Sequence, residues 1–177
     1  MSLEDGGISL GVMKTAAVKG IIPAGNKVSE LRSNLLRLIT ETSNVLDERF
    51  GAAGLEAVAE IFRRLGEEDA KTMRERLGFG DTLKDALDAW LVIGHIMGSK
   101  MEPNWISETR VEVSHSYCPQ HEEFLKRGNL YCTAACLPYV GAIGENIGRG
   151  VKMDVVRAAE ENAPCVKALS VPTKEIE

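Results

Sequence analysis

The chain has 177 residues, of which 44% are hydrophobic and 27% are charged, and its formal net charge is -5. This length and composition predict one ordinary globular domain, or one domain with a helical appendage, and a sizeable core. The acidic balance excludes broad nucleic-acid binding, because no basic face is long enough to neutralise several phosphates. No apolar run is long enough for a membrane span and no signal-peptide pattern opens the chain, so we expect a cytoplasmic protein with reduced thiols.

The first half of the chain predicts an arm followed by helices. Residues 1–25 have weak periodicity and form the predicted N-terminal arm, and residues 26–177 form a single domain. Apolar side chains recur at three- and four-residue steps over 28–50, which is typical of an amphipathic helix. A second helix is predicted over 55–65, and it continues or restarts through 67–77.

A third helix completes the helical part of the domain, residues 26–100. Asp81 is its predicted N-cap, and the residues over 83–93 are apolar around most of the helix girth. We therefore expect this helix to lie in the centre of the fold. Its large apolar surface also predicts self-association, so we expect a homodimer.

Residues 101–177 form the predicted sheet and cysteine-cluster part, where the periodicity changes to two. Strands are expected over 105–107 and 109–117, with a hairpin turn at Glu108-Thr109, and again over 151–155 and 165–171. Helices are expected over 119–127 and 132–147, the second of them shaped by Pro138. This order predicts an α+β fold in which helices pack on one face of an antiparallel sheet.

All four cysteines lie in the last third of the chain, at Cys118, Cys132, Cys136 and Cys165. Clustered cysteines in a reduced compartment are metal ligands or reactive thiols more often than disulfides. Cys118 and His121 span a strand-to-helix turn, and Cys132 and Cys136 share one helical face. We expect a zinc site that uses four of these five groups, with an iron–sulfur cluster as the alternative. The alternative without a metal is that the side chains of Cys132 and Cys136 are small buried apolar groups and that His121 lies on the surface.

Two kinds of chemistry are compatible with such a cluster. With only three protein ligands, a metal-bound water becomes acidic enough to attack carbon, and Glu145 or His115 is the candidate proton shuttle. Alternatively, Cys132 near a helix N-terminus acts as a nucleophile, with His115 or His121 as the base. Glu122 and Glu123 beside His121 are further candidate bases.

The cysteines also carry a resemblance to a known family. The C-terminal half resembles the family named after L-2-amino-thiazoline-4-carboxylic acid hydrolase, and is more distantly similar to 4-vinyl-reductase-type ligand-binding domains. The resemblance spans roughly 28–171 and implies an α+β ligand-binding fold. The residues that carry it are Cys118-Pro119, the helix with Cys132 and Cys136, the strand over 151–156, and the turn Glu160–Pro164 before Cys165.

The resemblance implies a ligand set. In the vinyl-reductase-type domains, cysteines and a glutamate near the chain's end hold Zn²⁺, which implies Cys165 here, with Cys136 or Cys132 opposite it. Glu160 or Glu161 would match the acidic ligand. Those domains carry two cysteines after the last turn and this chain carries one, so Cys118 is the candidate for the missing ligand.

Three functions remain open at this point. The first is metal-assisted hydrolysis of a small cyclic C–N or C–S substrate, as the hydrolase resemblance implies. The second is a non-enzymatic domain that binds a small molecule or acts as a sensor, with a structural metal. The third is an iron–sulfur or redox module. Four protein ligands would favour the second function, and three ligands plus water would favour the first.

Overall fold

The computed structural model describes residues 14, 15 and 17–172, and the chain divides into two units, residues 1–35 and 36–177. Most of the predicted arm lies outside the described residues. The division falls within helix α2 (Ala24–Phe50), C-terminal to the predicted end of the arm. The second unit holds all four cysteines.

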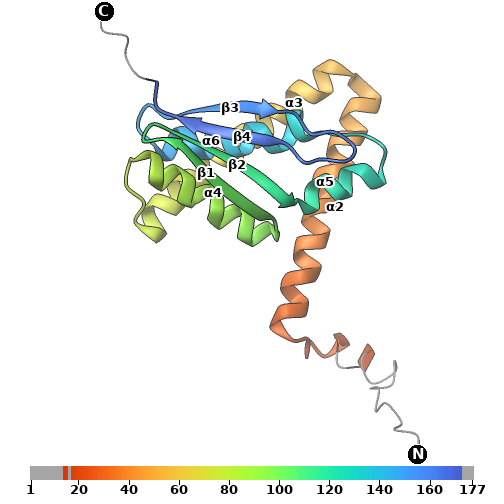
Figure 1. The fold of residues 1–177 in the computed structure, drawn as a ribbon. Coiled ribbons are helices and arrows are strands. Elements are labelled where there is room, and N and C mark those ends of the chain that lie inside the picture. The colour runs from red at the N-terminus through yellow and green to blue at the C-terminus, as the bar shows by residue number, and fades with distance from the viewer. Residues whose placement is uncertain (1–13, 16, 173–177) are drawn as a thin grey trace, which may run out of the picture. The chain divides into compact units, whose positions relative to one another are not determined.

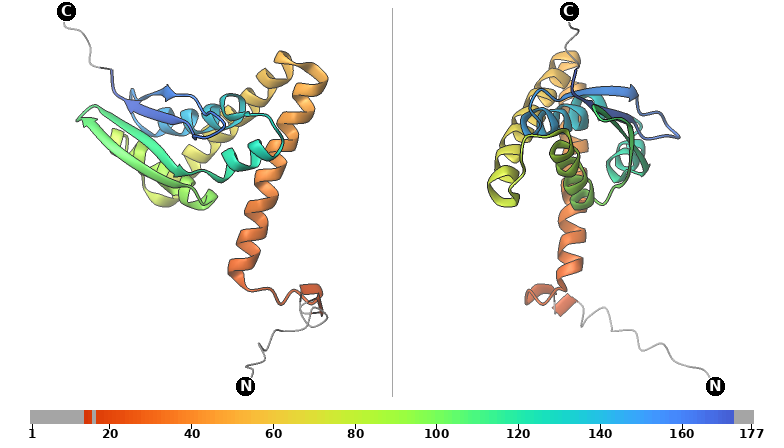
Figure 2. Two further views of the ribbon diagram at one scale, coloured as in Figure 1. Left: turned by 45° about the vertical axis from the view of Figure 1, so that its right-hand side comes forward. Right: turned by 60° about the vertical axis from the view of Figure 1, so that its left-hand side comes forward.

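The sheet confirms the predicted α+β class (Figure 1). It has four antiparallel strands in the order β1-β2-β4-β3, and the predicted hairpin turn joins the first two. Helices α4 and α6 lie against one face of this sheet, as the two views of Figure 2 also show. The strands are β1 (Lys100–Ser107), β2 (Arg110–Tyr117), β3 (Lys152–Arg157) and β4 (Val166–Ser170).

The helices follow the predicted order, except that the helix predicted over 132–147 begins with a π-helical turn. They are α3 (Ala52–Leu77), α4 (Leu83–Met97), α5 (Pro119–Lys126), the π-helical turn η1 (Cys132–Cys136) and α6 (Leu137–Ile147). Helix α3 runs without the break that the sequence allowed near residue 67. The small residue Gly66 lets this helix pack closely on α6. None of the described helices is both long and apolar enough to cross a membrane.

The cap of α4 corrects one sequence prediction. Thr82, rather than Asp81, is the N-cap: its side chain accepts a hydrogen bond from the Asp85 amide at 3.1 Å. The Asp85 carboxylate accepts one in return from the Thr82 amide at 3.1 Å, which completes a capping box. Asp81 instead forms an ion pair with Arg149 at 2.6 Å. The prediction of Asp81 was wrong because two adjacent polar residues can each cap, and only Thr82 has a carboxylate three residues on.

The main core lies between the sheet and helices α4 and α6, with Ala70 and Met73 of α3 in the same cluster. Trp90 is buried, and its indole Nε1 donates a hydrogen bond to the Val140 carbonyl of α6 at 2.6 Å. Val111 of β2 and Leu169 of β4 are fully buried in the same cluster. Helix α4 is therefore central, as predicted. Because most of its apolar side chains pack into its own domain, they supply no separate support for the predicted homodimer.

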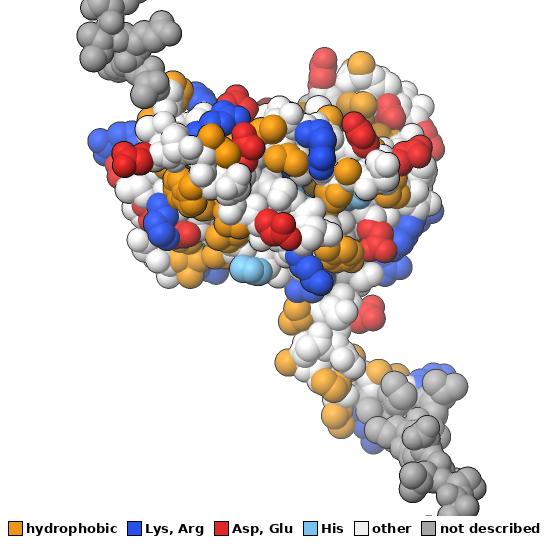
Figure 3. All heavy atoms as spheres, viewed as in Figure 1, with side chains coloured by type: hydrophobic (Ala, Val, Ile, Leu, Met, Phe, Trp, Pro, Cys, Tyr) orange, Lys and Arg blue, Asp and Glu red, His pale blue; other side chains and the backbone are white. Residues whose placement is uncertain are grey.

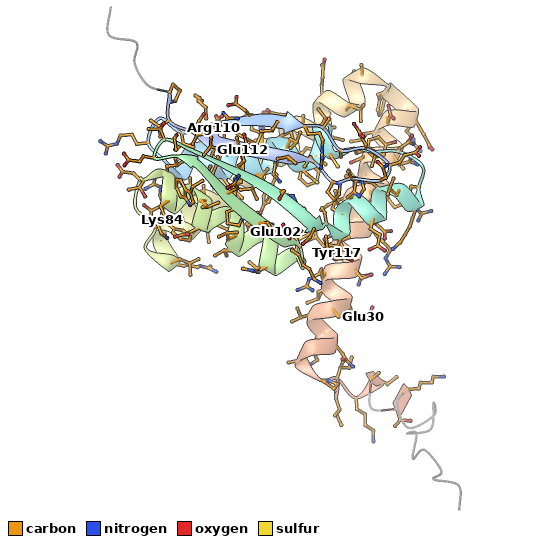
Figure 4. All side chains as sticks on the ribbon, in the orientation of Figure 1. Glu30, Lys84, Glu102, Arg110, Glu112 and Tyr117 are labelled. Atoms are coloured by element: carbon orange, nitrogen blue, oxygen red, sulfur yellow. The ribbon has the colours of Figure 1, made fainter. Side chains whose placement is uncertain are left out.

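The opposite face of the sheet is polar. Arg110 pairs with Glu112 of the same strand at 3.4 Å and with Asp154 of β3 at 3.3 Å (Figure 4). Figure 3 shows acidic and basic side chains interspersed over the face in view. Along β2, the buried Val111 and Val113 alternate with the half-buried Arg110 and Glu112, as expected of a strand with one face on the core. In β4, by contrast, Lys167, Ala168 and Leu169 are all buried.

Gly66→Ala should destabilise the protein by about 2 kcal/mol, because the added methyl would overlap the Tyr139 carbonyl and lie 2.9 Å from the Ala142 side chain. Gly25→Ala is the matched control, since nothing lies within 4 Å of its new methyl. The control should be neutral, or stabilising by up to about 1 kcal/mol, through helix propensity. Urea midpoints measure both changes, and equal midpoints for the two variants would contradict the close packing of α3 on α6.

Candidate functional site

The pairing of β2 with β4 brings two distant cysteines to the same end of the sheet. The strands are antiparallel, with Val113 opposite Lys167, so the end of β2 lies beside the start of β4. Cys118 directly follows β2 and occupies the N-cap position of α5 without a side-chain capping hydrogen bond, and Cys165 directly precedes β4. His115 bridges the two strands, because its Nδ1 lies 3.4 Å from the Cys165 carbonyl oxygen.

The other two cysteines lie on the π-helical turn η1. The amide of Leu137 donates to the Cys132 carbonyl, a five-residue step instead of the usual four. Pro138 follows at once, and it has no amide hydrogen to donate to the carbonyl of Ala134 four residues back. The ring also crowds that carbonyl, which explains why the turn widens here. The helix start at Cys132 was predicted, and the widened turn around both cysteines was not.

Cys132 and Cys136 share a side-chain hydrogen bond, and Cys118 and Cys132 influence the pKa values of the other two thiols electrostatically. We call Cys118, Cys132, Cys136 and Cys165 the thiol cluster. A side-chain hydrogen bond from Cys136 lowers the pKa of Cys132. The same contact, together with burial, raises the pKa of Cys136 well above its ordinary value, because Cys136 keeps the shared proton. Burial raises the pKa of Cys165, and negative charge on Cys132 and Cys118 adds to this effect. Three separate segments of the chain therefore contribute thiols to one electrostatic environment.

Lys167 of β4 is a charged residue beside this cluster. Its side chain is on the core side of the sheet, only 5% of the residue is exposed, and its Nζ lies 5.4 Å from the centre of the Trp90 ring. Its positive charge lowers the pKa of Cys132, Cys136 and Cys165. Sequence reasoning did not select Lys167. The available signal was its place in the alternation, on the same face as Cys165 and Leu169.

His115 is a neutral base within this environment. Burial, with a further contribution from the Lys167 charge, lowers its pKa to about 4. Since a carbonyl oxygen only accepts hydrogen bonds, Nδ1 carries the proton in its contact with Cys165. Nε2 then has the free lone pair, which is the form of imidazole that binds a metal or accepts a proton.

His121 does not lie on the surface, where the alternative without a metal predicted it. It is buried, and its Nε2 lies 2.6 Å from the backbone oxygen of Glu160. Glu160 and Ala163 exchange two backbone hydrogen bonds across the turn that leads to Cys165. The observed contact of His121 therefore holds this turn against α5. Gln120 holds the other side of α5, because its Nε2 donates to the Thr40 hydroxyl at 3.0 Å.

The candidate glutamates make contacts outside the thiol cluster. Glu145 is exposed and binds the Lys152 ammonium at 3.4 Å and the Met153 amide at 3.3 Å, both in β3. Glu122 accepts a hydrogen bond from the Tyr117 hydroxyl at 2.8 Å, and Glu123 pairs with Lys126 at 3.1 Å. Within the described part of the chain, no hydrogen bond joins any of these carboxylates to a cysteine.

A bound metal would need some rearrangement of the cluster. Over residues 14, 15 and 17–172, no three His, Cys, Asp or Glu side chains stand close enough together to hold an ion. The donor types nevertheless fit a soft metal, since four thiols and one imidazole lone pair are present. No protein-family model matches the chain, and no curated protein matches it either. The resemblance to the thiazoline-carboxylate hydrolases therefore stays a prediction.

His115 should make the metal-free protein less stable in acid. Its folded pKa of about 4 lies below the ordinary 6.5, so its stabilising effect is complete above pH 6.5 and is lost as the pH falls toward 4. Because the ring is partly exposed, we expect a loss of about 2 kcal/mol relative to His115→Gln between about pH 7 and pH 4.5. Urea unfolding at both pH values, with a chelator present, measures this difference. Parallel losses in the two proteins would show that His115 does not titrate in this way.

Proposed function

We propose that this protein binds a soft metal ion, in the first instance zinc, through the thiol cluster. The observations that support the proposal are the hydrogen bond between Cys132 and Cys136 and the strand pairing that brings Cys118 and Cys165 to one end of the sheet. The four cysteines come from the end of β2, the turn η1 and the start of β4. The alternative is that Cys132 and Cys136 serve as small apolar groups, since Cys132 lies in a hydrophobic cluster with Val58 and Phe124 and Cys136 packs against it.

The chemistry of the donors supports zinc over magnesium or calcium. Thiolates are soft ligands, and four of them make a closed tetrahedral site. Cys132 loses its proton most readily, because Cys136 donates a hydrogen bond to its sulfur. The ion would supply the positive charge that keeps four thiolates together. A cytoplasmic setting is part of the proposal, since thiols stay reduced there.

The ligand count bears on the choice between a sensor and a hydrolase. Four thiols are enough to fill a zinc site without a water molecule, which favours a structural or small-molecule-sensing role over hydrolysis. His115 offers a fifth donor, because its neutral Nε2 could replace one thiol as a ligand. The hydrolase, the small-molecule ligand and the homodimer remain proposals for later tests.

Protein purified without air should contain about one zinc ion per chain. Replacing any one of Cys118, Cys132, Cys136 or Cys165 by Ser should weaken zinc binding by at least about tenfold, as a competing chelator would measure. Thr133→Ala is the matched control, because Thr133 is exposed between two of the cysteines on η1. It should bind zinc like the wild-type protein.

Two other results would decide against zinc. Iron with a visible absorption band would support the iron–sulfur alternative at the same cysteines. Neither zinc nor iron in the anaerobic protein, and no uptake of either on addition, would overturn the metal proposal.

A further inference from the structure

We infer that helix α2 is the contact surface of a homodimer, in which it packs antiparallel against α2 of a second copy of this chain. The inference comes from a row of exposed apolar side chains along this helix. It assigns a surface to the proposed homodimer, and it is independent of the metal proposal because no cysteine takes part in it.

The exposed apolar residues of α2 repeat every seven residues. Counted from residue 28, the first and fourth positions of three successive heptads are apolar, except for Thr42. The five apolar members are all exposed, and Leu31 and Leu38 reach 68% and 63% exposure. Alternating steps of three and four residues are typical of a coiled coil, in which such side chains interlock with those of a partner helix. We call these residues the α2 stripe: Val28, Leu31, Leu35, Leu38 and Val45.

A different face of α2 is the one that is buried within the chain. The buried residues of the helix are Leu36, Thr40 and Ser43, which recur at three- and four-residue steps of their own. At 3.6 residues per turn, the centre of that face lies about a third of a turn around the axis from the α2 stripe. Nothing in the described part of the chain covers the stripe, and a contiguous exposed apolar surface of this kind marks a protein contact.

A second copy of the chain fits the α2 stripe because the pattern is complementary to itself. When two α2 helices run antiparallel about a centre near Leu36, every apolar member of one stripe lies level with a stripe position of the other. The contact is then symmetric, with the same residues used by both copies. Its layers join Val28 to Val45, Leu31 to Thr42 and Leu35 to Leu38, with one member of each pair on either copy.

Charge favours the antiparallel orientation. Residues at the seventh heptad position lie side by side across an antiparallel contact, which places Lys27 of one copy beside Glu48 of the other. Both side chains are exposed, and the neutral amide of Asn44 that donates to Glu48 at 2.9 Å leaves the carboxylate charge uncompensated. A parallel dimer would instead set Lys27 beside Arg32 of the second copy, which is a like-charge contact.

Sedimentation velocity of the full chain, with a chelator present, tests the contact. The wild-type protein should dimerise reversibly over the micromolar range. Leu31→Gln combined with Leu38→Gln should raise the dissociation constant at least about tenfold, because the leucines then no longer bury apolar surface. Leu77→Gln is the matched control, since Leu77 is an exposed leucine at the end of α3, outside the stripe. It should leave the dissociation constant unchanged.

A charge swap tests the orientation. Lys27→Glu and Glu48→Lys should each weaken the dimer by about threefold or more, because each places like charges side by side at both ends of the symmetric contact. The two substitutions together should restore the wild-type dissociation constant. Additive losses in the double variant, or a tighter dimer for Lys27→Glu alone, would overturn the antiparallel arrangement.

Two further outcomes keep this inference apart from the metal proposal. A wild-type protein that stays monomeric, or a dimer that the two leucine substitutions leave as tight as before, overturns the inference and leaves the zinc proposal standing. A protein that dimerises through α2 and binds no metal overturns the zinc proposal alone. The urea midpoint of the Leu31→Gln, Leu38→Gln variant, measured where the wild-type protein is monomeric, should equal that of the wild type because both leucines are exposed.

Discussion

The candidate site depends on one pairing, that of β2 with β4. These strands are far apart in the sequence, and their antiparallel register places Val113 opposite Lys167. Because of that register, the chain leaving β2 and the chain entering β4 meet at one end of the sheet. A shift of the register by one residue would turn Lys167 to the polar face and end its contact with Trp90.

Trp90 joins the hydrophobic core to the site. Its indole nitrogen holds the Val140 carbonyl of α6, while its ring lies beneath the Lys167 ammonium. Helix α6 continues directly from η1, so the same side chain steadies the helix that carries Cys132 and Cys136 and the cation that acts on them. Packing and electrostatics are therefore linked through a single residue, which explains why a lysine is tolerated on the core side of the sheet.

The thiol cluster is asymmetric. Cys132 and Cys136 share a hydrogen bond in which one sulfur holds the proton and the other approaches the thiolate form. Burial raises the pKa of Cys165, so this thiol keeps its proton to a higher pH than an exposed thiol does. The histidines are divided in a similar way, since His115 offers a free lone pair beside the cluster and His121 anchors the turn before Cys165. Both the metal proposal and the nucleophile alternative draw on this division of roles.

The sequence by itself determined the α+β class, the element order and the four thiols, because hydrophobic periodicity and residue type are local properties. It also marked Pro138 as a disturbance of the last helix. Only the tertiary structure decided that His121 contacts a turn, that Glu145 contacts β3, and that Lys167 is buried over the Trp90 ring. These facts depend on which distant segments meet, and strand register and helix packing set that, rather than spacing along the chain.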